Sequence, residues 1–380
     1  MNQLPIYLDY NATTPLLPEV VDAMLPYLRE HFGNPSSIHS FGKRAREATE
    51  GARMEVARLL GCHPDEVFFT SGGTESNNLA IRGATDARPD RRHIVTSSIE
   101  HPAVANPCAY LERHGYEVTR LPVGRDGRVD PTDVAAFLRG DTLLVTIMHA
   151  NNEVGTLEPI GEMSRIAHEK GALAHTDAAQ SVGKVPLIVG DLGVDLLSVA
   201  GHKLYAPKGV GALYVRRGTP IRPFMLGAGH ERGLRPGTEN VASIVGLGRA
   251  CAIARETLTS EASRVRALRD RLWELLRTQI PGIELNGHHS ERLPNTLNVR
   301  FPGAFGSRVL ERAPEIAAST GSACHEGGES PSGVLLAMGV EPRAALGSVR
   351  LSLGRGTTSG QVEHAAATLV RAWKEEINGR

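Results

Sequence analysis

Two lysines stand close together in the stretch "SVAGHKLYAPKGVG", Ser198–Gly211, which follows the apolar run Val194–Leu197. The chain has only six lysines among its 42 basic residues, yet Lys203 and Lys208 both fall where a buried strand is expected to end. A lysine in a low-dielectric pocket can lose its proton, and a neutral amine can form a Schiff base with an aldehyde. The alternative is a structural lysine whose stem is buried and whose amine reaches solvent.

A second polar cluster, "SGGTESNN" (Ser71–Asn78), follows the apolar run "EVFFT". Small residues before a helix offer backbone N–H groups and a hydroxyl to a phosphate. The cluster lacks the lysine of a P-loop, so a nucleoside triphosphate is not implied. A simple helix cap by Ser71 or Thr74 is the alternative.

Three further expected strands also end in polar residues. His101 follows one strand in "EHPAV", and Asn152 follows another in "NNEVGT". In "LAHTDAAQSVG", Asp177 ends an apolar strand and Gln180 comes three residues later. A histidine or an amide at such a place commonly completes a cap or a turn. A buried acid, in contrast, needs a cation or hydrogen-bond donors.

Taken together, these clusters provide a phosphate site, an isolated acid, an imidazole and an amine that can be neutral. Pyridoxal 5'-phosphate meets all four requirements. Its phosphate would lie on "SGGTES", the acid would keep the pyridine nitrogen protonated, the imidazole would stack on the ring, and the lysine would condense with the aldehyde. This cofactor is the prediction that the residue types support.

The elements that must position these residues alternate along the first two thirds of the chain. Seven strands separated by helices predict an α/β fold with a mainly parallel sheet, whose ligands lie at the carboxyl ends of the strands. The expected strands are Val67–Thr70, His93–Ser97, Val118–Leu121, Leu143–Met148, Leu173–Thr176, Leu196–Val199 and Ala212–Val215. The expected helices are Glu19–Glu30, Lys43–Leu60, Glu75–Arg82, Ala103–His114, Pro131–Arg139 and Ile160–Lys170.

The last third has a different pattern. A long helix is expected over Ile244–Arg277, followed by strands near Thr296–Phe301 and Val349–Leu353 and a final helix at Gln361–Asn378. We therefore expect a large domain over residues 16–255 and a small α+β domain formed by residues 1–15 and 256–380.

Composition excludes several classes of protein. Among 380 residues, Lys+Arg and Asp+Glu are 42 each, so no overall charge recruits nucleic acid or an anionic membrane. No window is apolar enough to span a membrane, and the N-terminus does not resemble a targeting peptide, so we expect a cytoplasmic protein. The four cysteines are too scattered for a disulfide framework, and we expect no metal site.

The chain resembles the cysteine desulfurase and selenocysteine lyase family, which belongs to the class-V aminotransferase-like, fold-type-I enzymes that use pyridoxal phosphate. Eleven motifs in the family's order span nearly the whole sequence. They are "YLDYNATTP", "GNPSSIHSFGKRAR", "FTSGGTESNN", "EHPAV", "NNEVGT", "HTDAAQSVGK", "GHKLYAPKGVGALY", "ERGLRPGTEN", "LPNTLN", "GSAC" and "VRLSLGR".

The resemblance implies a role for each matching position. Lys203 matches the Schiff-base lysine, Asp177 the partner of the pyridinium, and His101 the imidazole stacked on the ring. Gln180 and Asn152 match residues near the ring hydroxyl. Phosphate ligands are matched by Gly73, Thr74 and His202, and by Thr238, which the neighbouring subunit of a homodimer would supply. Arg350 matches the arginine that binds the substrate carboxylate, with Asn34 assisting it.

One position departs from the pattern of the desulfurases that serve iron–sulfur assembly. They carry a hydroxyl three residues before the Schiff-base lysine, whereas this chain has Ala200. The missing hydrogen bond to the phosphate costs about 1.5–3 kcal/mol unless water or Ser198 replaces it. Selenocysteine lyases also have an apolar residue there, and their active loop resembles "GSACHEGGESPSGVLL".

Cys324 lies in the Gly/Ser-rich stretch "STGSACHEGGESPSG", whereas Cys62, Cys108 and Cys251 lie beside apolar neighbours as core cysteines do. The resemblance therefore implies that L-cysteine is converted to L-alanine, with its sulfur left as a persulfide on Cys324 for an acceptor protein. Lys203 and His101 are the expected proton carriers. The alternatives are a selenocysteine lyase and a binding protein that keeps the cofactor without chemistry.

Overall fold

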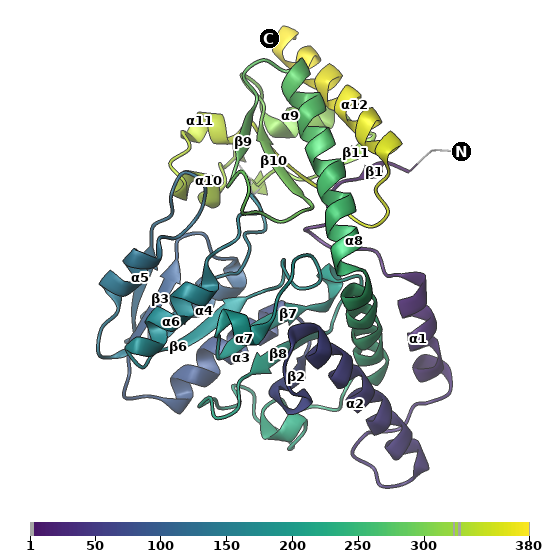
Figure 1. Cartoon of the computed structure of the whole chain (residues 1–380), viewed down its shortest axis with the longest axis vertical. Coiled ribbons are helices and arrows are strands. Elements are labelled where there is room, and N and C mark those ends of the chain that lie inside the picture. Colours follow the sequence, from purple (N-terminus) through teal and green to yellow (C-terminus); the bar gives the residue numbers. More distant parts are fainter. Residues whose placement is uncertain (1–3, 322–323, 326–327, 380) are drawn as a thin grey trace.

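A seven-stranded sheet forms the centre of the larger part of the molecule (Figure 1). The computed structural model describes residues 4–321, 324–325 and 328–379, and for 324–325 and 328–329 it describes the backbone alone. The strand order is β2-β8-β7-β6-β5-β3-β4, and β8 alone runs against its neighbours. The prediction of an α/β fold with a mainly parallel seven-stranded sheet is confirmed.

The strands are short and mostly buried on both faces, as expected for a sheet covered by helices. Their bounds are β2 Val67–Thr70, β3 His93–Ser97, β4 Glu117–Leu121, β5 Thr142–Thr146, β6 Leu173–Asp177, β7 Leu196–Ala200 and β8 Gly211–Val215. The largest difference from the prediction is at β5, which ends at Thr146 rather than at Met148. Beyond Thr146 the Met148 N–H donates to the Glu100 carboxylate rather than to a strand, although the Ile147 N–H still donates to the His175 carbonyl of β6.

Alternate residues of the strands pack into two hydrophobic clusters, one on each face of the sheet. One cluster contains Ile94 and Leu144 together with helices α3 and α4, and the other contains Val95 and Val145 together with α2, α6 and α8. The helices of this part are α1 Pro18–Arg29, α2 Ser40–Leu60, α3 Gly73–Ala87, α4 Pro102–Glu112, α5 Pro131–Phe137, α6 Ile160–Glu169 and α7 Val189–Leu192. Single 3-10 turns lie at η1 Pro64–Glu66, η2 Gly201–Lys203 and η3 Glu231–Gly233.

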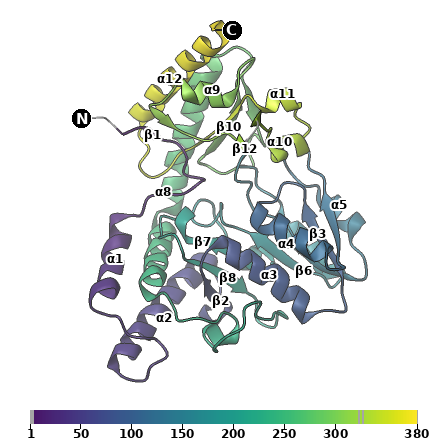
Figure 2. The same cartoon turned by 180° about the vertical axis from the view of Figure 1, so that it is seen from behind.

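The long helix α8 (Val241–Gln279) connects the two parts of the molecule (Figures 1 and 2). Beyond it, a small antiparallel sheet has the order β14-β10-β9 and is covered by α12. The remaining bounds are β1 Ile6–Tyr7, β9 Glu284–Asn286, β10 Thr296–Arg300, α9 Gly306–Glu311, β11 Ile316–Ala317, β12 Cys324–His325, β13 Gly328–Glu329, α10 Gly333–Ala337, α11 Pro342–Ala345, β14 Ser348–Ser352 and α12 Ser359–Asn378.

The hydrophobic core divides in the same way. Residues between Val20 and Ala254 form the core around one face of the large sheet, whereas Leu8 joins residues between Val265 and Trp373 in a separate cluster. Strand β1 pairs with β11, so the N-terminal segment packs with the C-terminal part. This division supports our proposal of a large domain at 16–255 and a small domain at 1–15 and 256–380. No helix within the described ranges is both long and apolar enough to cross a membrane.

A buried ion pair fixes the segment before α8 against the large sheet. The two terminal nitrogens of the Arg53 guanidinium, Nη1 and Nη2, lie 2.8 Å from the Glu231 carboxylate, and the two side chains are almost fully buried. Glu231 also accepts the backbone N–H of Phe69, and Arg53 donates to the Val67 carbonyl. Helix α2, strand β2 and η3 are therefore held at one point.

We predict that Glu231→Ala lowers the free energy of unfolding by about 3–5 kcal/mol, because it removes the buried partner of the Arg53 guanidinium and leaves only the half-exposed Glu50. The matched control is Glu112→Ala, which removes an exposed pair with Arg120 and should cost less than about 1 kcal/mol. Urea titration of both variants measures the difference. Equal losses would show that the buried pair has no special role.

Candidate active site

Helix α3 begins directly after β2 without a side chain to cap it. Gly72 occupies the cap position with φ 146°, a conformation that favours glycine, and no side chain of the described residues accepts a hydrogen bond from the first turn. The cap by Ser71 or Thr74 is therefore not formed. The N–H groups at Gly73 and Thr74 remain available, and the helix dipole favours an anion there.

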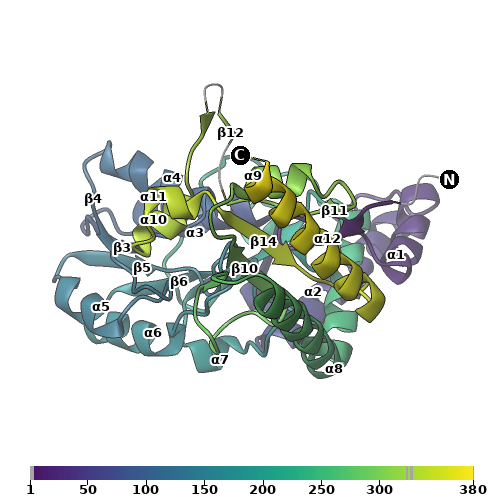
Figure 3. The ribbon, with the colours of Figure 1, turned by 90° about the horizontal axis from the view of Figure 1, so that it is seen from above.

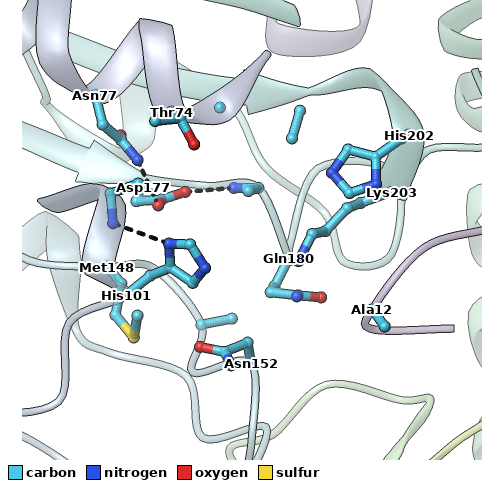
Figure 4. Close-up of a pocket in the computed structure, with 15 residues that line it drawn as sticks. Ala12, Thr74, Asn77, His101, Met148, Asn152, Asp177, Gln180, His202 and Lys203 are labelled. Atoms are coloured by element: carbon cyan, nitrogen blue, oxygen red, sulfur yellow. Dashed lines mark hydrogen bonds between the residues drawn. The ribbon is translucent and has the colours of Figure 1, made fainter. Parts of the chain in front are cut away.

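Asp177 ends β6 as a nearly buried carboxylate, 7% exposed. Asn77 Nδ2 donates to one of its oxygens at 2.7 Å and the Ala179 N–H donates to the other at 2.9 Å (Figure 4). The carboxylate forms no ion pair with any residue that the structure describes, and Asn77 Oδ1 has no hydrogen-bond partner there either. The site can therefore accept a cationic group from a ligand.

Lys203 ends η2, the turn that follows β7. Its Nζ donates to the backbone carbonyl of Asn11 at 2.9 Å. Burial lowers the pKa of Lys203 to about 8; the Asp177 carboxylate opposes this shift and the Arg350 guanidinium adds to it. The amine can consequently become neutral at a pH where an exposed lysine stays charged.

Two histidines flank this amine with their rings held by neighbours. His101 Nδ1 accepts the Ala103 N–H at 3.1 Å at the start of α4, which leaves the ring proton on Nε2. Burial lowers the pKa of His101, and the negative charge of Asp177 partly opposes this shift. The His202 ring lies 3.2 Å from the Thr13 hydroxyl, and burial, with the nearby Lys203 charge, lowers its pKa to about 4. Both rings are thus neutral near pH 7.

Arg350, on β14 of the small sheet, reaches the same region. Its Nη1 donates to the Asn152 carbonyl at 3.1 Å and its Nη2 to Asp9 Oδ1 at 2.7 Å. Nε is buried and has no partner among the described residues. A guanidinium with an unused N–H is suited to bind a carboxylate.

A cavity of about 210 Å³ joins the groups around Lys203 and Asp177, whereas Arg350 does not line it (Figure 4). It is lined by Lys203, Asp177, His101, Asn152 and Gln180, and also by Gly73, Thr74 and His202. The structure therefore brings together eight of the predicted residues, which come from the carboxyl ends of several strands as an open α/β sheet requires.

Other predicted residues lie elsewhere. Asn34 and Thr238 are exposed, and neither lines the cavity. The Cys324 side chain lies outside the described part of the structure, although its backbone forms β12, which projects with β13 from the small domain (Figure 3). The roles of these three residues stay predictions. Lys208 is exposed and does not line the cavity, in line with a structural role.

Ala200 faces the start of α3, since a Cβ added to Gly73 would lie 3.2 Å from the Ala200 Cβ. The Ser198 hydroxyl, which could have replaced the absent hydrogen bond, is buried against the His175 ring at 3.1 Å. Ser198 therefore does not compensate for the alanine.

Two residues of the site, Asn77 and Asn11, were not predicted from the sequence. Asn77 follows Gly73 and Thr74 by one helical turn, and this spacing could have placed it on the same face of α3. Asn11 binds Lys203 through its carbonyl, but its partners lie more than a hundred residues away, so no local pattern identifies it.

The profile of the family Aminotransferase class-V matches residues 6–364. The chain belongs to this family. It is 49% identical over 369 residues to the cysteine desulfurase IscS of Dictyoglomus turgidum, covering 96% of this chain and 94% of that relative. The cysteine desulfurase IscS of Anaeromyxobacter dehalogenans is 48% identical, with 99% and 93% covered.

Solved structures show the same architecture. A "NifS-like protein" superposes with a TM-score of 0.92 at 39% identity, covering 98% of this chain and 100% of that chain. A structure described as "SspA in complex with cysteine" superposes with a TM-score of 0.82 at 38% identity, with 93% and 99% covered. At these identities and TM-scores, the two structures resemble this chain in family as well as in fold.

We predict that Lys203 of the cofactor-free protein reacts with an amine reagent with a midpoint near pH 8, against about 10.4 for a lysine model peptide. Below the midpoint the amine is protonated and unreactive, and above it the amine is a nucleophile. Asp177→Asn should move the midpoint to lower pH because it removes a charge that stabilises the ammonium. Mass spectrometry of the Lys203 peptide over a pH series measures both, and a midpoint equal to that of the peptide would contradict the buried amine.

Proposed function

We propose that the protein is a pyridoxal-phosphate-dependent cysteine desulfurase that converts L-cysteine to L-alanine and keeps the sulfur as a persulfide on Cys324. One observation carries the proposal. A single cavity contains an amine with a pKa of about 8 and a buried carboxylate with no ion-pair partner among the described residues. Relatives that are 48–49% identical and named cysteine desulfurase support it.

The residues present fit this cofactor. Bound pyridoxal phosphate supplies an aldehyde that bonds to amines and a protonated pyridine ring that withdraws electrons from the substrate. Lys203 would hold the aldehyde, Asp177 the ring N–H, and His101 one face of the ring. Asn77 holds Asp177 in place at 2.7 Å. The phosphate would be bound by the uncapped start of α3 at Gly73 and Thr74 and by His202.

The chain's own groups can bind the substrate and move its protons. The Arg350 guanidinium would bind the carboxylate of cysteine, and its buried Nε–H has no partner among the described residues. Lys203 Nζ, with a pKa of about 8, can accept a proton near neutral pH and return it. His101 carries its proton on Nε2 because Nδ1 accepts the Ala103 N–H, so it can act as the second proton carrier.

Cys324 would receive the sulfur. Its Sγ forms a bond to the substrate sulfur, the carbon–sulfur bond of the substrate breaks, and the carbon skeleton leaves as alanine after protonation. Cys62, Cys108 and Cys251 are poor candidates because burial raises the pKa of each thiol, to about 12 for Cys62 and Cys108. These three thiols are free, as expected in a reducing cytoplasm, where we place the enzyme.

We further propose a homodimer in which Thr238 reaches the phosphate site of the partner subunit and a separate protein accepts the sulfur. The exposed position of Thr238, away from its own cavity, supports the first part. The relatives are named cysteine desulfurase, which favours cysteine over selenocysteine as the substrate. Because the family consists of enzymes, a binding protein without catalytic activity is not favoured.

We predict that Cys324→Ala lowers alanine formation from L-cysteine by roughly a hundredfold or more, because the thiol nucleophile is lost. Cofactor binding should be unchanged, since the cofactor groups lie elsewhere. The matched control is Cys62→Ala, which removes a half-buried free thiol and should keep wild-type turnover. Mass spectrometry of the wild type after one turnover should find one extra sulfur on the Cys324 peptide.

Wild-type turnover by Cys324→Ala would rule out the persulfide mechanism. If the variant lost cysteine turnover but kept most of its activity on L-selenocysteine, the selenocysteine lyase alternative would be favoured instead. Selenium is the better leaving atom and can depart without a thiol.

A further inference from the structure

A second lysine amine is buried beside the site, and none of the roles above uses it. Lys184 Nζ donates to Gln180 Oε1 at 3.0 Å and to Asn11 Oδ1 at 3.3 Å. Lys184 does not line the 210 Å³ cavity; it lines a smaller one of about 40 Å³ beside Tyr10 and Tyr205. Any effect on the site must therefore pass through the residues that it contacts.

Gln180 is the contact that does line the main cavity. Its Nε2 donates to the Asn11 carbonyl at 3.0 Å, and its Oε1 accepts from Lys184, so both ends of the carboxamide are held. A carbonyl oxygen can only accept, and the end facing Asn11 must therefore be the NH2 group. Only one of the two hydrogens on Nε2 has a partner among the described residues, which leaves one N–H for the cavity.

We propose that Lys184 is a positioning residue that keeps the Gln180 carboxamide turned with its N–H toward the cofactor. This inference rests on the proposed function, because it assumes that pyridoxal phosphate occupies the cavity. Without Lys184, Gln180 Oε1 is a buried acceptor with no donor, which is costly. Rotation of the carboxamide toward the open cavity relieves that cost but turns the acceptor oxygen, in place of the N–H, toward the expected position of the ring hydroxyl.

The protonation state of Lys184 does not decide this role. Burial, with the charges of Lys203 and Arg350, lowers the pKa of Lys184 well below its usual value. A neutral amine keeps two N–H groups, which is the number that Gln180 and Asn11 accept. The contact therefore acts as a hydrogen bond rather than as a charge.

The test compares Lys184→Met with Lys184→Gln in the full chain. Cofactor-free protein is titrated with pyridoxal phosphate, and Kd and the pH titration of the visible absorbance are measured. Lys184→Met should raise Kd roughly tenfold and shift the absorbance titration. Lys184→Gln keeps a donor and should recover most of the loss. Lys170→Met, at an exposed lysine on the end of α6, is the control and should match the wild type.

A double-mutant cycle shows whether Lys184 acts on cofactor binding through Gln180. In a Gln180→Ala background, Lys184→Met should have almost no further effect on Kd, because the carboxamide that it positions is absent. An undiminished effect there, or no effect in the wild-type background, would overturn the inference. Failure of the wild type itself to bind pyridoxal phosphate would overturn the proposed function instead. Thermal unfolding of the cofactor-free variants shows whether each is folded.

Discussion

The site depends on a short N-terminal segment that is buried between the two domains. Asn11 is fully buried, and its carbonyl accepts both Lys203 Nζ and Gln180 Nε2. Its side chain and N–H bind Thr296, Asn295 and Ser352 of the small domain. One residue thus connects the amine of the large domain to the sheet of the small one. Without it, the lysine amine would be buried with no acceptor, which is costly.

The small domain contributes Arg350 and the chain segment that leads to Cys324. Arg350 lies on β14 and bonds to Asp9 and to the Asn152 carbonyl, and its backbone pairs with Ser319 just before the stretch that contains Cys324. The arginine proposed to bind the substrate carboxylate and the chain that leads to the thiol therefore share one anchor. In the proposed reaction, the contacts of Arg350 would therefore place the substrate and also hold the backbone at Ser319.

Much of the fold could be predicted because apolar strands buried on both faces leave a clear pattern. Strands β2 and β3 have the predicted bounds, and β5 ends two residues early, where the Glu100 carboxylate accepts the Met148 N–H. Residues at strand ends, such as Asp177 and Lys203, were predictable because parallel strands bring their carboxyl ends together.

Contacts made across the chain were not predictable in the same way. Asn11 lies 192 residues from Lys203, and its role arises only when the two domains pack. Lys184 stands four residues beyond Gln180, but nothing local indicates that its amine turns inward to the carboxamide. Polar residues acquire such partners from tertiary packing rather than from a sequence pattern.

The central claim is that Lys203 is the amine that holds the cofactor. Borohydride reduction of the protein loaded with pyridoxal phosphate, followed by peptide mapping, tests it most directly, because reduction makes the bond to the lysine permanent. The account predicts one reduced pyridoxyl group, on the peptide that contains Lys203, and its loss in Lys203→Ala. Pyridoxyl on Lys184 or Lys208 in the wild type would contradict it.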